Sequence, residues 1–200
     1  METSITILVA TVVVSFLCFN HQVLFRAFAF APILVVHRFE IHRLITHGFV
    51  HANWTHLLVN MFTFYSFGIY VEGAFGEMGF ATWAFAALYF GGMVAASLYD
   101  LIKHGNDPNY CSIGASGAVS AVLFTSIFLN PWSKIYLFAV IPIPGILFGG
   151  AYLLYCHLMA LGSDDNINHN AHFYGALYGF FFPAFLDRSL LSRFFDLLTS

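Results

Sequence analysis

The chain has 200 residues, of which 60% are hydrophobic and 8% are charged. A soluble domain carries roughly 25% charged residues, so this composition argues against a soluble domain and predicts an integral membrane protein. The formal net charge is -3, and without a basic stripe nucleic-acid binding has no support. Cys18, Cys111 and Cys156 are widely spaced and match neither a disulfide framework nor a zinc motif. The length favours one domain over residues 1–200.

Six apolar stretches approach the roughly 20 residues that a helix needs to cross the hydrocarbon core. They cover residues 5–19, 54–74, 80–98, 113–129, 135–161 and 171–186. The segment between the first two stretches mixes apolar residues with arginine and glutamate, which indicates an interfacial loop with short helices. The expected fold class is therefore all-α, a polytopic bundle of six transmembrane helices with a long first loop. Pro142 and Pro144 predict that the fifth helix is kinked or locally loosened.

Ser116 opens the fourth stretch and His172 opens the sixth. Because one span separates these two helices, they run in the same direction and both residues are expected at one face. Basic residues occur on both sides, so charge alone does not assign that face to a compartment. The fourth stretch would be about 25 Å long, shorter than the hydrocarbon core. Its serine is therefore predicted below the membrane surface, where non-helical backbone requires protein or a water-filled cavity beside it.

A serine hydroxyl is a weak nucleophile, and a neutral histidine is a suitable base to activate it. For Ser116 and His172 to meet, their helices must approach closely. Small residues of the kind that permit such contact in membranes surround both. They are Gly117, Ala118 and Ala121 in the fourth stretch, and Gly175, Ala176 and Gly179 in the sixth. The alternative interpretation is that these glycines serve helix packing alone.

Acyl transfer also requires hydrogen-bond donors for the oxyanion that develops on the carbonyl. The backbone N–H of Ser116 is one candidate, because it lies near a helix N-terminus. His56 and Asn60 are the others, since a spacing of four places them on one helix face. The competing interpretation is that both residues make interhelical hydrogen bonds that hold the bundle together.

Several motifs occur in order along the chain. They are the run from His42 to His47 followed by His51, the run from His56 to Asn60, Gly114-Ala115-Ser116-Gly117, and Ala171-His172 with Gly175 and Gly179. Together they cover most of the chain and resemble the signature of the rhomboid intramembrane serine proteases, in their minimal six-helix form. The resemblance implies that other membrane proteins, cut in or near a transmembrane segment within the bilayer, are the substrates.

The resemblance also implies roles for individual residues. Ser116 would be the nucleophile and His172 the general base and acid, with no acidic third member. His56, Asn60 and the Ser116 amide would stabilise the oxyanion. A structural role is implied for Arg43, Gly114, Gly117, Gly175, Gly179 and Glu72. The kinked fifth helix would serve as a lateral gate for the substrate, or the kink would be passive.

Two positions depart from the family pattern. His42 stands where the family's first loop carries a tryptophan before its arginine, and Ser120 stands where many members carry a tyrosine stacked on the catalytic histidine. The ring of His172 would then be oriented by other neighbours, for which Phe173 and Tyr174 are the candidates. Neither departure removes a reacting atom, so activity is expected.

A metal or haem site is the weaker interpretation of the histidine cluster. His42, His47, His51 and His56 crowd together, and His47 and His51 have a spacing that metal sites use. No carboxylate or cysteine completes the set, so neither a metal nor another cofactor is expected.

The sequence thus predicts a multi-pass membrane serine endopeptidase, expected in a bacterial plasma membrane. The alternative is a catalytically inactive rhomboid-like protein that binds transmembrane helices without cutting them. A small transporter or haem protein built on the histidines is a third class. The sequence assigns no oligomeric state and no natural substrate.

Overall fold

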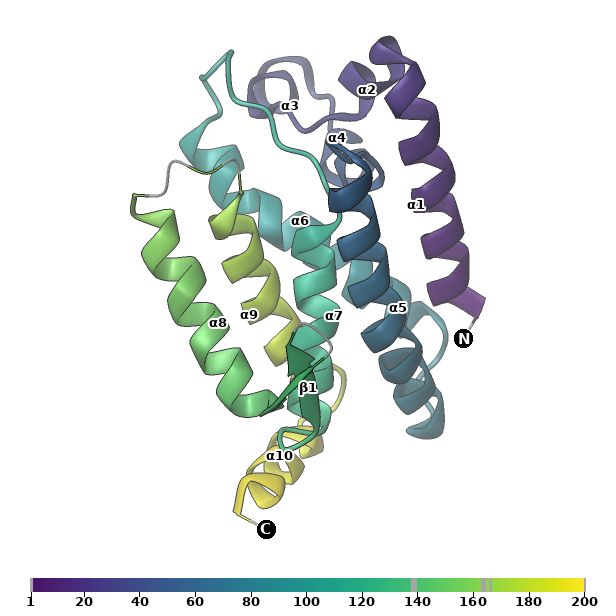
Figure 1. The fold of residues 1–200 in the computed structure, drawn as a ribbon, viewed down its shortest axis with the longest axis vertical. Coiled ribbons are helices and arrows are strands. Elements are labelled where there is room, and N and C mark those ends of the chain that lie inside the picture. The colour runs from purple at the N-terminus through teal and green to yellow at the C-terminus, as the bar shows by residue number, and fades with distance from the viewer. Residues whose placement is uncertain (1, 138–139, 163–164, 166, 200) are drawn as a thin grey trace.

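The computed structural model describes residues 2–137, 140–162, 165 and 167–199. In this described part, six long helices form a polytopic helical membrane bundle (Figure 1). They are α1 (Glu2–Asn20), α5 (Trp54–Glu77), α6 (Trp83–Lys103), α7 (Ser116–Leu129), α8 (Gly145–Ala160) and α9 (His169–Leu186). By length and composition α1 and α6 are able to cross a membrane, while α7 and α8 are shorter apolar helices. Hydrophobic patterning therefore located all six helices.

The segment before α8 corrects one expectation. Residues 135–144 were expected inside a helix kinked by proline, but strands β1 (Lys134–Leu137) and β2 (Ile141–Pro144) pair there as an antiparallel hairpin. Proline cannot donate a backbone hydrogen bond and fixes φ, so Pro142 and Pro144 suit this hairpin and the start of a helix. Helix α8 begins after them and contains no proline. The expected kink within the helix is wrong, because both prolines precede α8. The role of this helix as a lateral gate stays a prediction.

The loop between α1 and α5 carries the short helices that were predicted. They are α2 (Gln22–Phe28), α3 (Pro32–Arg38), α4 (Arg43–Thr46) and the 3-10 helix η1 (His47–Phe49).

The buried guanidinium of Arg43 holds this loop together. It donates to the carbonyl oxygens of Arg26 (2.8 Å) and Ala29 (2.6 Å) and pairs with the Glu40 carboxylate. Charge-assisted bonds of this kind fix geometry strongly. The Arg43 side chain therefore bridges three segments of one loop.

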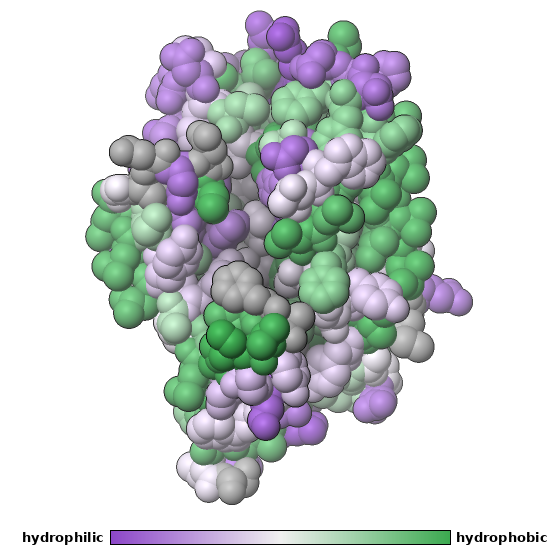
Figure 2. Space-filling model, in the orientation of Figure 1, coloured by the Kyte–Doolittle hydropathy of each residue, from purple (hydrophilic) through white to green (hydrophobic). Residues whose placement is uncertain are grey.

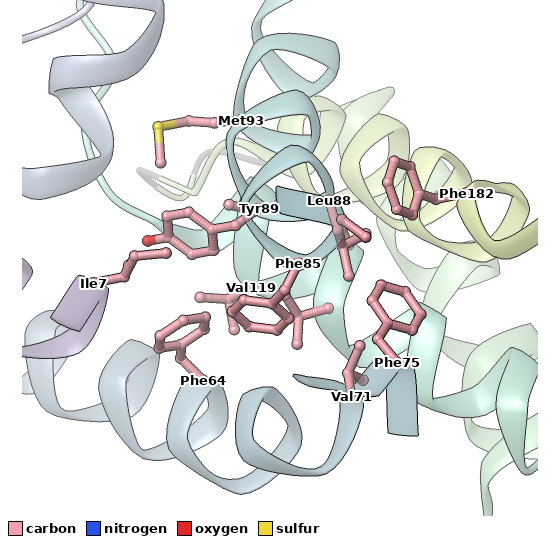
Figure 3. Packing of buried hydrophobic residues seen from close by; sticks show 14 of the residues in the cluster. Ile7, Phe64, Val71, Phe75, Phe85, Leu88, Tyr89, Met93, Val119 and Phe182 are labelled. Atoms are coloured by element: carbon pink, nitrogen blue, oxygen red, sulfur yellow. The ribbon is translucent and has the colours of Figure 1, made fainter. Parts of the chain in front are cut away.

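Helix α7 is the centre of the bundle, because each of its residues after Ser116 is buried. On one side it packs against aromatic residues of α5 and α6. Figure 3 shows Val119 beside Phe64 and Phe85, with Tyr89 above them. The ring centroids of Phe64 and Tyr89 are 4.9 Å apart, a distance typical of favourable aromatic pairs. This core fixes the height and rotation of the helix that begins with Ser116.

Glu72 ties α5 to the start of α1. Its carboxylate accepts hydrogen bonds from the Ser4 hydroxyl (2.6 Å) and from the backbone N–H groups of Thr3 and Ser4, both at 3.0 Å. The first N–H groups of a helix have no intrahelical partner, and a carboxylate there also interacts favourably with the helix dipole. The acidic side chain thus caps a neighbouring helix, in agreement with a structural role.

A further helix, α10 (Ser189–Thr199), follows α9 at the C-terminal end of the bundle (Figure 1). It buries Leu190 and Phe194 and exposes its polar face. Phe194 stacks on Phe128 of α7 with ring centroids 4.9 Å apart. Figure 2 shows hydrophilic side chains at the two ends of the molecule and mainly hydrophobic ones along the flanks between them. An apolar flank between polar ends is the surface expected of a membrane-spanning bundle.

Candidate active site

The backbones of α7 and α9 touch along a line of small residues. A Cβ atom added to Gly175 would collide with the Gly117 carbonyl, and one added to Gly179 would collide with the Ala121 carbonyl. At the next turn, the hydroxyl of Thr125 donates to the Gly179 carbonyl oxygen across 2.6 Å. Such contact is possible only where neither helix carries a side chain larger than a methyl group. The starts of the two helices are therefore held side by side.

Ser116 and His172 line one cavity of about 1000 Å³. Ser116 is the first residue of α7, and His172 lies in the first turn of α9; both side chains are half-buried. His56 and Asn60 from α5 line the same cavity. Within the described residues, no hydrogen bond joins the Ser116 hydroxyl and the His172 ring. Catalytic hydrogen bonds are often long in unliganded proteins and tighten when substrate binds.

The loop before α7 fits around the His56 ring. Gly114 has φ +111°, which favours glycine. A Cβ on Gly114 would lie 2.7 Å from His56 Cε1 and 2.8 Å from Nε2, so the ring occupies the space that a side chain would need. The Gly114 N–H donates to the carbonyl oxygen of His47 (3.0 Å), which anchors this loop to the first loop. Gly114 therefore sets both the path into Ser116 and the position of His56.

Two hydrogen bonds at the start of α5 fix the positions of His56 and Asn60. Asn53 caps the helix, and its side-chain oxygen accepts from the His56 backbone N–H (2.8 Å). The buried Asn60 amide donates one hydrogen to the His56 carbonyl oxygen (3.1 Å). An amide nitrogen carries two hydrogens, so a second donor on Asn60 is available for a ligand in the cavity.

Asn168 is a positioning residue that sequence reasoning missed. Its side-chain oxygen accepts from the Ala171 N–H (2.9 Å), which caps α9 one residue before His172. Its amide nitrogen lies within hydrogen-bond distance of the buried Asp100 carboxylate of α6 and of the Tyr110 and Ser112 hydroxyls of the loop after α6, so these three acceptors share its two hydrogens. An asparagine directly before an apolar helix is an N-cap signal, and that signal was available in the sequence.

The neighbour that stacks on His172 is Tyr152 of α8, which corrects a second expectation. The rings of Tyr152 and His172 are stacked, with centroids 6.4 Å apart and planes 20° apart. The Tyr152 hydroxyl is hydrogen-bonded to the Ser120 hydroxyl (2.9 Å). The expected candidates lie elsewhere, because Phe173 contacts His157 and Tyr174 stacks on Tyr99. The serine at 120 thus holds a tyrosine supplied by another helix.

Two histidines of the first loop make hydrogen bonds that hold the loop in place. His51 is fully buried, and its Nδ1 lies 2.8 Å from the Ser15 hydroxyl. Because Ser15 gives its one hydrogen to the Phe49 carbonyl oxygen, His51 Nδ1 must be the donor to Ser15. His47 Nδ1 lies 2.7 Å from the Arg43 carbonyl oxygen. Burial lowers the pKa of His47 to about 4 and, with a contribution from His56, that of His51 to about 3.

The histidine set of the weaker, metal-site interpretation does not assemble in the described residues, but a different set of possible ligands does. Within the described residues, His42, His47, His51 and His56 do not bring three ligand atoms together. Cys156, His169 and His172 do so beside the cavity. Sequence spacing carried no recognisable signal for this group, because Cys156 belongs to α8 and the two histidines to α9.

The fold and cavity define a class: a polytopic helical membrane protein with a cavity into which polar side chains from the starts of α5, α7 and α9 converge. Comparison with known families refines this. The Rhomboid domain model matches residues 38–189, so the chain belongs to the rhomboid family. A curated relative, RHOMBOID-like protein 12, mitochondrial, from Arabidopsis thaliana, is 30% identical over 152 residues. The match covers 68% of this chain and 44% of that protein. Membership of the rhomboid family, which the motifs indicated, is confirmed.

Proposed function

We propose that this rhomboid-family protein is an intramembrane serine endopeptidase that hydrolyses a peptide bond in or near a transmembrane segment of another protein. The observation that carries the proposal is the single cavity lined by Ser116, His172, His56 and Asn60. A nucleophile, a base and two donor side chains are the parts that acyl transfer requires. They enter the cavity from three helices whose packing fixes their relative positions.

The reaction follows from these parts. The Ser116 Oγ attacks the carbonyl carbon while the neutral His172 ring accepts its proton, and the carbonyl oxygen becomes an oxyanion. The Ser116 backbone N–H, His56 and the second Asn60 hydrogen donate to that oxyanion. His172 then gives its proton to the departing amine, leaving an ester on Ser116. Water from the cavity, deprotonated by His172, attacks the ester and restores the free hydroxyl.

The proposed reaction requires an accessible peptide carbonyl, and this requirement limits the class of substrate. A peptide bond within an intact helix has its carbonyl hydrogen-bonded and its backbone shielded, so the substrate helix must unwind locally. Residues that destabilise helices, such as glycine, serine and asparagine, are therefore expected near the cut bond. The substrates and partners of the whole protein belong to the same proposal, since the match covers 44% of the curated relative.

The test is cleavage of a fluorescent transmembrane peptide by purified protein in detergent. Ser116→Ala and His172→Ala are each expected to abolish cleavage. Ser126→Ala is a matched control, because Ser126 is a buried serine of the same helix that donates within α7, to the Leu123 carbonyl oxygen. Equal cleavage by wild type and both site variants would overturn the proposal.

A catalytically inactive rhomboid-like protein that binds transmembrane helices is the second candidate. Two observations favour it: Ser116 and His172 share no hydrogen bond within the described residues, and the family's stacking tyrosine is absent at Ser120. A folded protein whose Ser116 fails to react with a fluorophosphonate, but which still binds the peptide, would establish it. Residence in a bacterial plasma membrane stays a prediction, since the curated relative is named as mitochondrial.

A further inference from the structure

Beside the cavity lies a group of three metal-ligating side chains that the peptidase reaction does not use as a set. Cys156 of α8 and His169 and His172 of α9 place one sulfur and two ring nitrogens within 4.8 Å of one another. Cys156 is fully buried and His169 is 3% exposed. His169 and His172 line the cavity, so the group is next to the space that water and small ions can enter.

His169 carries a second, independent sign of a ligand site. Its Nδ1 is buried and has no hydrogen-bond partner in the described part of the chain. Its Nε2 lies 3.1 Å from both carboxylate oxygens of Asp165. A metal-bound histidine usually donates its other ring N–H to a carboxylate, which fixes the ring and strengthens the ligand. Asp165 already occupies that outer position, and the unpartnered Nδ1 is the atom left for a metal.

The donor set selects the kind of ion. One thiolate and two imidazoles suit Zn²⁺ and similar soft or borderline ions, whereas Mg²⁺ and Ca²⁺ require oxygen ligands. Tetrahedral Zn²⁺ with ordinary bond lengths separates its sulfur and nitrogen ligands by about 3.3–3.6 Å. The three atoms must therefore close by roughly 1 Å, which side-chain rotation can provide. A water molecule from the cavity would complete four-coordination.

We propose that Cys156, His169 and His172 form a Zn²⁺ site whose occupation reversibly inhibits the enzyme. Binding replaces the thiol proton of Cys156 by the metal and releases that proton to solvent, with no change of oxidation state. It also commits the lone pair of a His172 ring nitrogen to the metal, and because the other ring nitrogen then carries the hydrogen, the ring has no acceptor left for the Ser116 proton. The proposal of the metal site rests on the positions and contacts of the three side chains alone. Its inhibitory consequence rests on the proposed peptidase function.

The first experiment measures binding without reference to activity. Purified full-length protein in detergent is titrated with Co²⁺, which gives a thiolate charge-transfer band when a cysteine ligates it. About one equivalent is expected to bind in a tetrahedral site and to be displaced by Zn²⁺. Cys156→Ser and His169→Ala should lose the band. Cys18→Ser and Cys111→Ser are matched controls that should keep it, since neither cysteine belongs to the group. A band that is absent, or that persists in Cys156→Ser, overturns the site.

The second experiment measures the consequence. Fluorophosphonate labelling of Ser116 is followed for each protein with and without Zn²⁺, and reversal is tested with a chelator. In wild type, Zn²⁺ should slow labelling by about tenfold or more, because the base is sequestered. In Cys156→Ser the same Zn²⁺ concentration should have little effect. Equal inhibition of both proteins would overturn inhibition through this site. If wild-type protein is not labelled at all, the peptidase proposal is wrong. The Co²⁺ titration would still show whether the metal site exists.

Discussion

The histidines of the first loop and those at the start of α9 contrast in how their ring atoms are used. His47 and His51 are buried, and each uses Nδ1 in a hydrogen bond, His47 with the Arg43 carbonyl oxygen and His51 with the Ser15 hydroxyl of α1. His169 and His172 line the cavity, as His47 also does. The unpartnered Nδ1 of His169 lies in a group of three metal-ligating side chains, whereas the unpartnered Nε2 of His51 lies in no such group within the described part of the chain. Both groups belong to an apolar protein in which polar side chains are costly. The difference indicates that one group stabilises the fold and the other is available for chemistry.

The largest expected difference is in cleavage. His172→Ala should lower kcat/KM for a transmembrane peptide by about 10³-fold or more, because the proposed general base for Ser116 is lost. His51→Ala should instead lower the melting temperature in detergent, since it removes a buried partner of Ser15. Measured per folded molecule, its cleavage should stay within about threefold of wild type. A catalytic loss in His51→Ala as large as that in His172→Ala would remove the distinction.

The pH dependence of stability tests the loop histidines directly. Burial holds the pKa of His47 near 4, below the ordinary value of about 6.5. Its contribution is therefore fully present above pH 6.5 and is lost as the pH falls toward 4, by on the order of 3 kcal/mol. Thermal unfolding of wild type and His47→Gln should be compared between pH 7 and 4. Wild type should lose more stability than the variant, and parallel curves would contradict the assignment.

The helices of the bundle were easier to predict from the sequence than the contacts of the candidate site. Hydropathy located the six helices, because the bilayer imposes a long apolar run on each. It failed before α8, where residues 135–144 are as apolar as a helix but contain Pro142 and Pro144, which suit the hairpin. The small residues at the α7–α9 contact were identifiable, since close helix packing in lipid requires them.

Contacts between distant parts of the chain were harder to predict. The pair Tyr152 and Ser120 lies 32 residues apart in sequence, and its members come from two helices whose relative rotation the sequence does not specify. The same holds for Cys156 and the two histidines of α9. Asn168 is different, because its capping position could have been recognised, although its bond to Asp100 could not.

A smaller effect is expected at the cap of α9. Asn168→Ala removes the acceptor for the Ala171 N–H and leaves the buried Asp100 carboxylate without this donor. Loss of an N-cap and of a buried partner together should cost about 1–3 kcal/mol. Chemical unfolding in mixed detergent would measure this. The control is Asn170→Ala, two residues later in the first turn of α9. Equal losses of unfolding free energy in the two variants would argue against a capping role for Asn168.

The smallest expected effect concerns the ring stacked on His172. Tyr152→Phe keeps the ring and loses the bond to Ser120, so kcat should fall only a few-fold, whereas Tyr152→Leu should lower it by about tenfold. The pH midpoint of kcat/KM should also move in Tyr152→Leu, because the neighbour of the base has changed. Leu154→Ala, an exposed change on α8, is the control. Identical kinetics and pH midpoints for Tyr152→Phe and Tyr152→Leu would show that stacking does not position the base.

The most direct measurement is covalent modification of Ser116 by a fluorophosphonate, read by intact mass on folded protein in detergent. One adduct is expected on wild type and on Ser126→Ala, none on Ser116→Ala, and slowed formation by about 10³-fold on His172→Ala. Unmodified wild type that is demonstrably folded, or undiminished labelling of His172→Ala, would contradict a serine activated by this histidine.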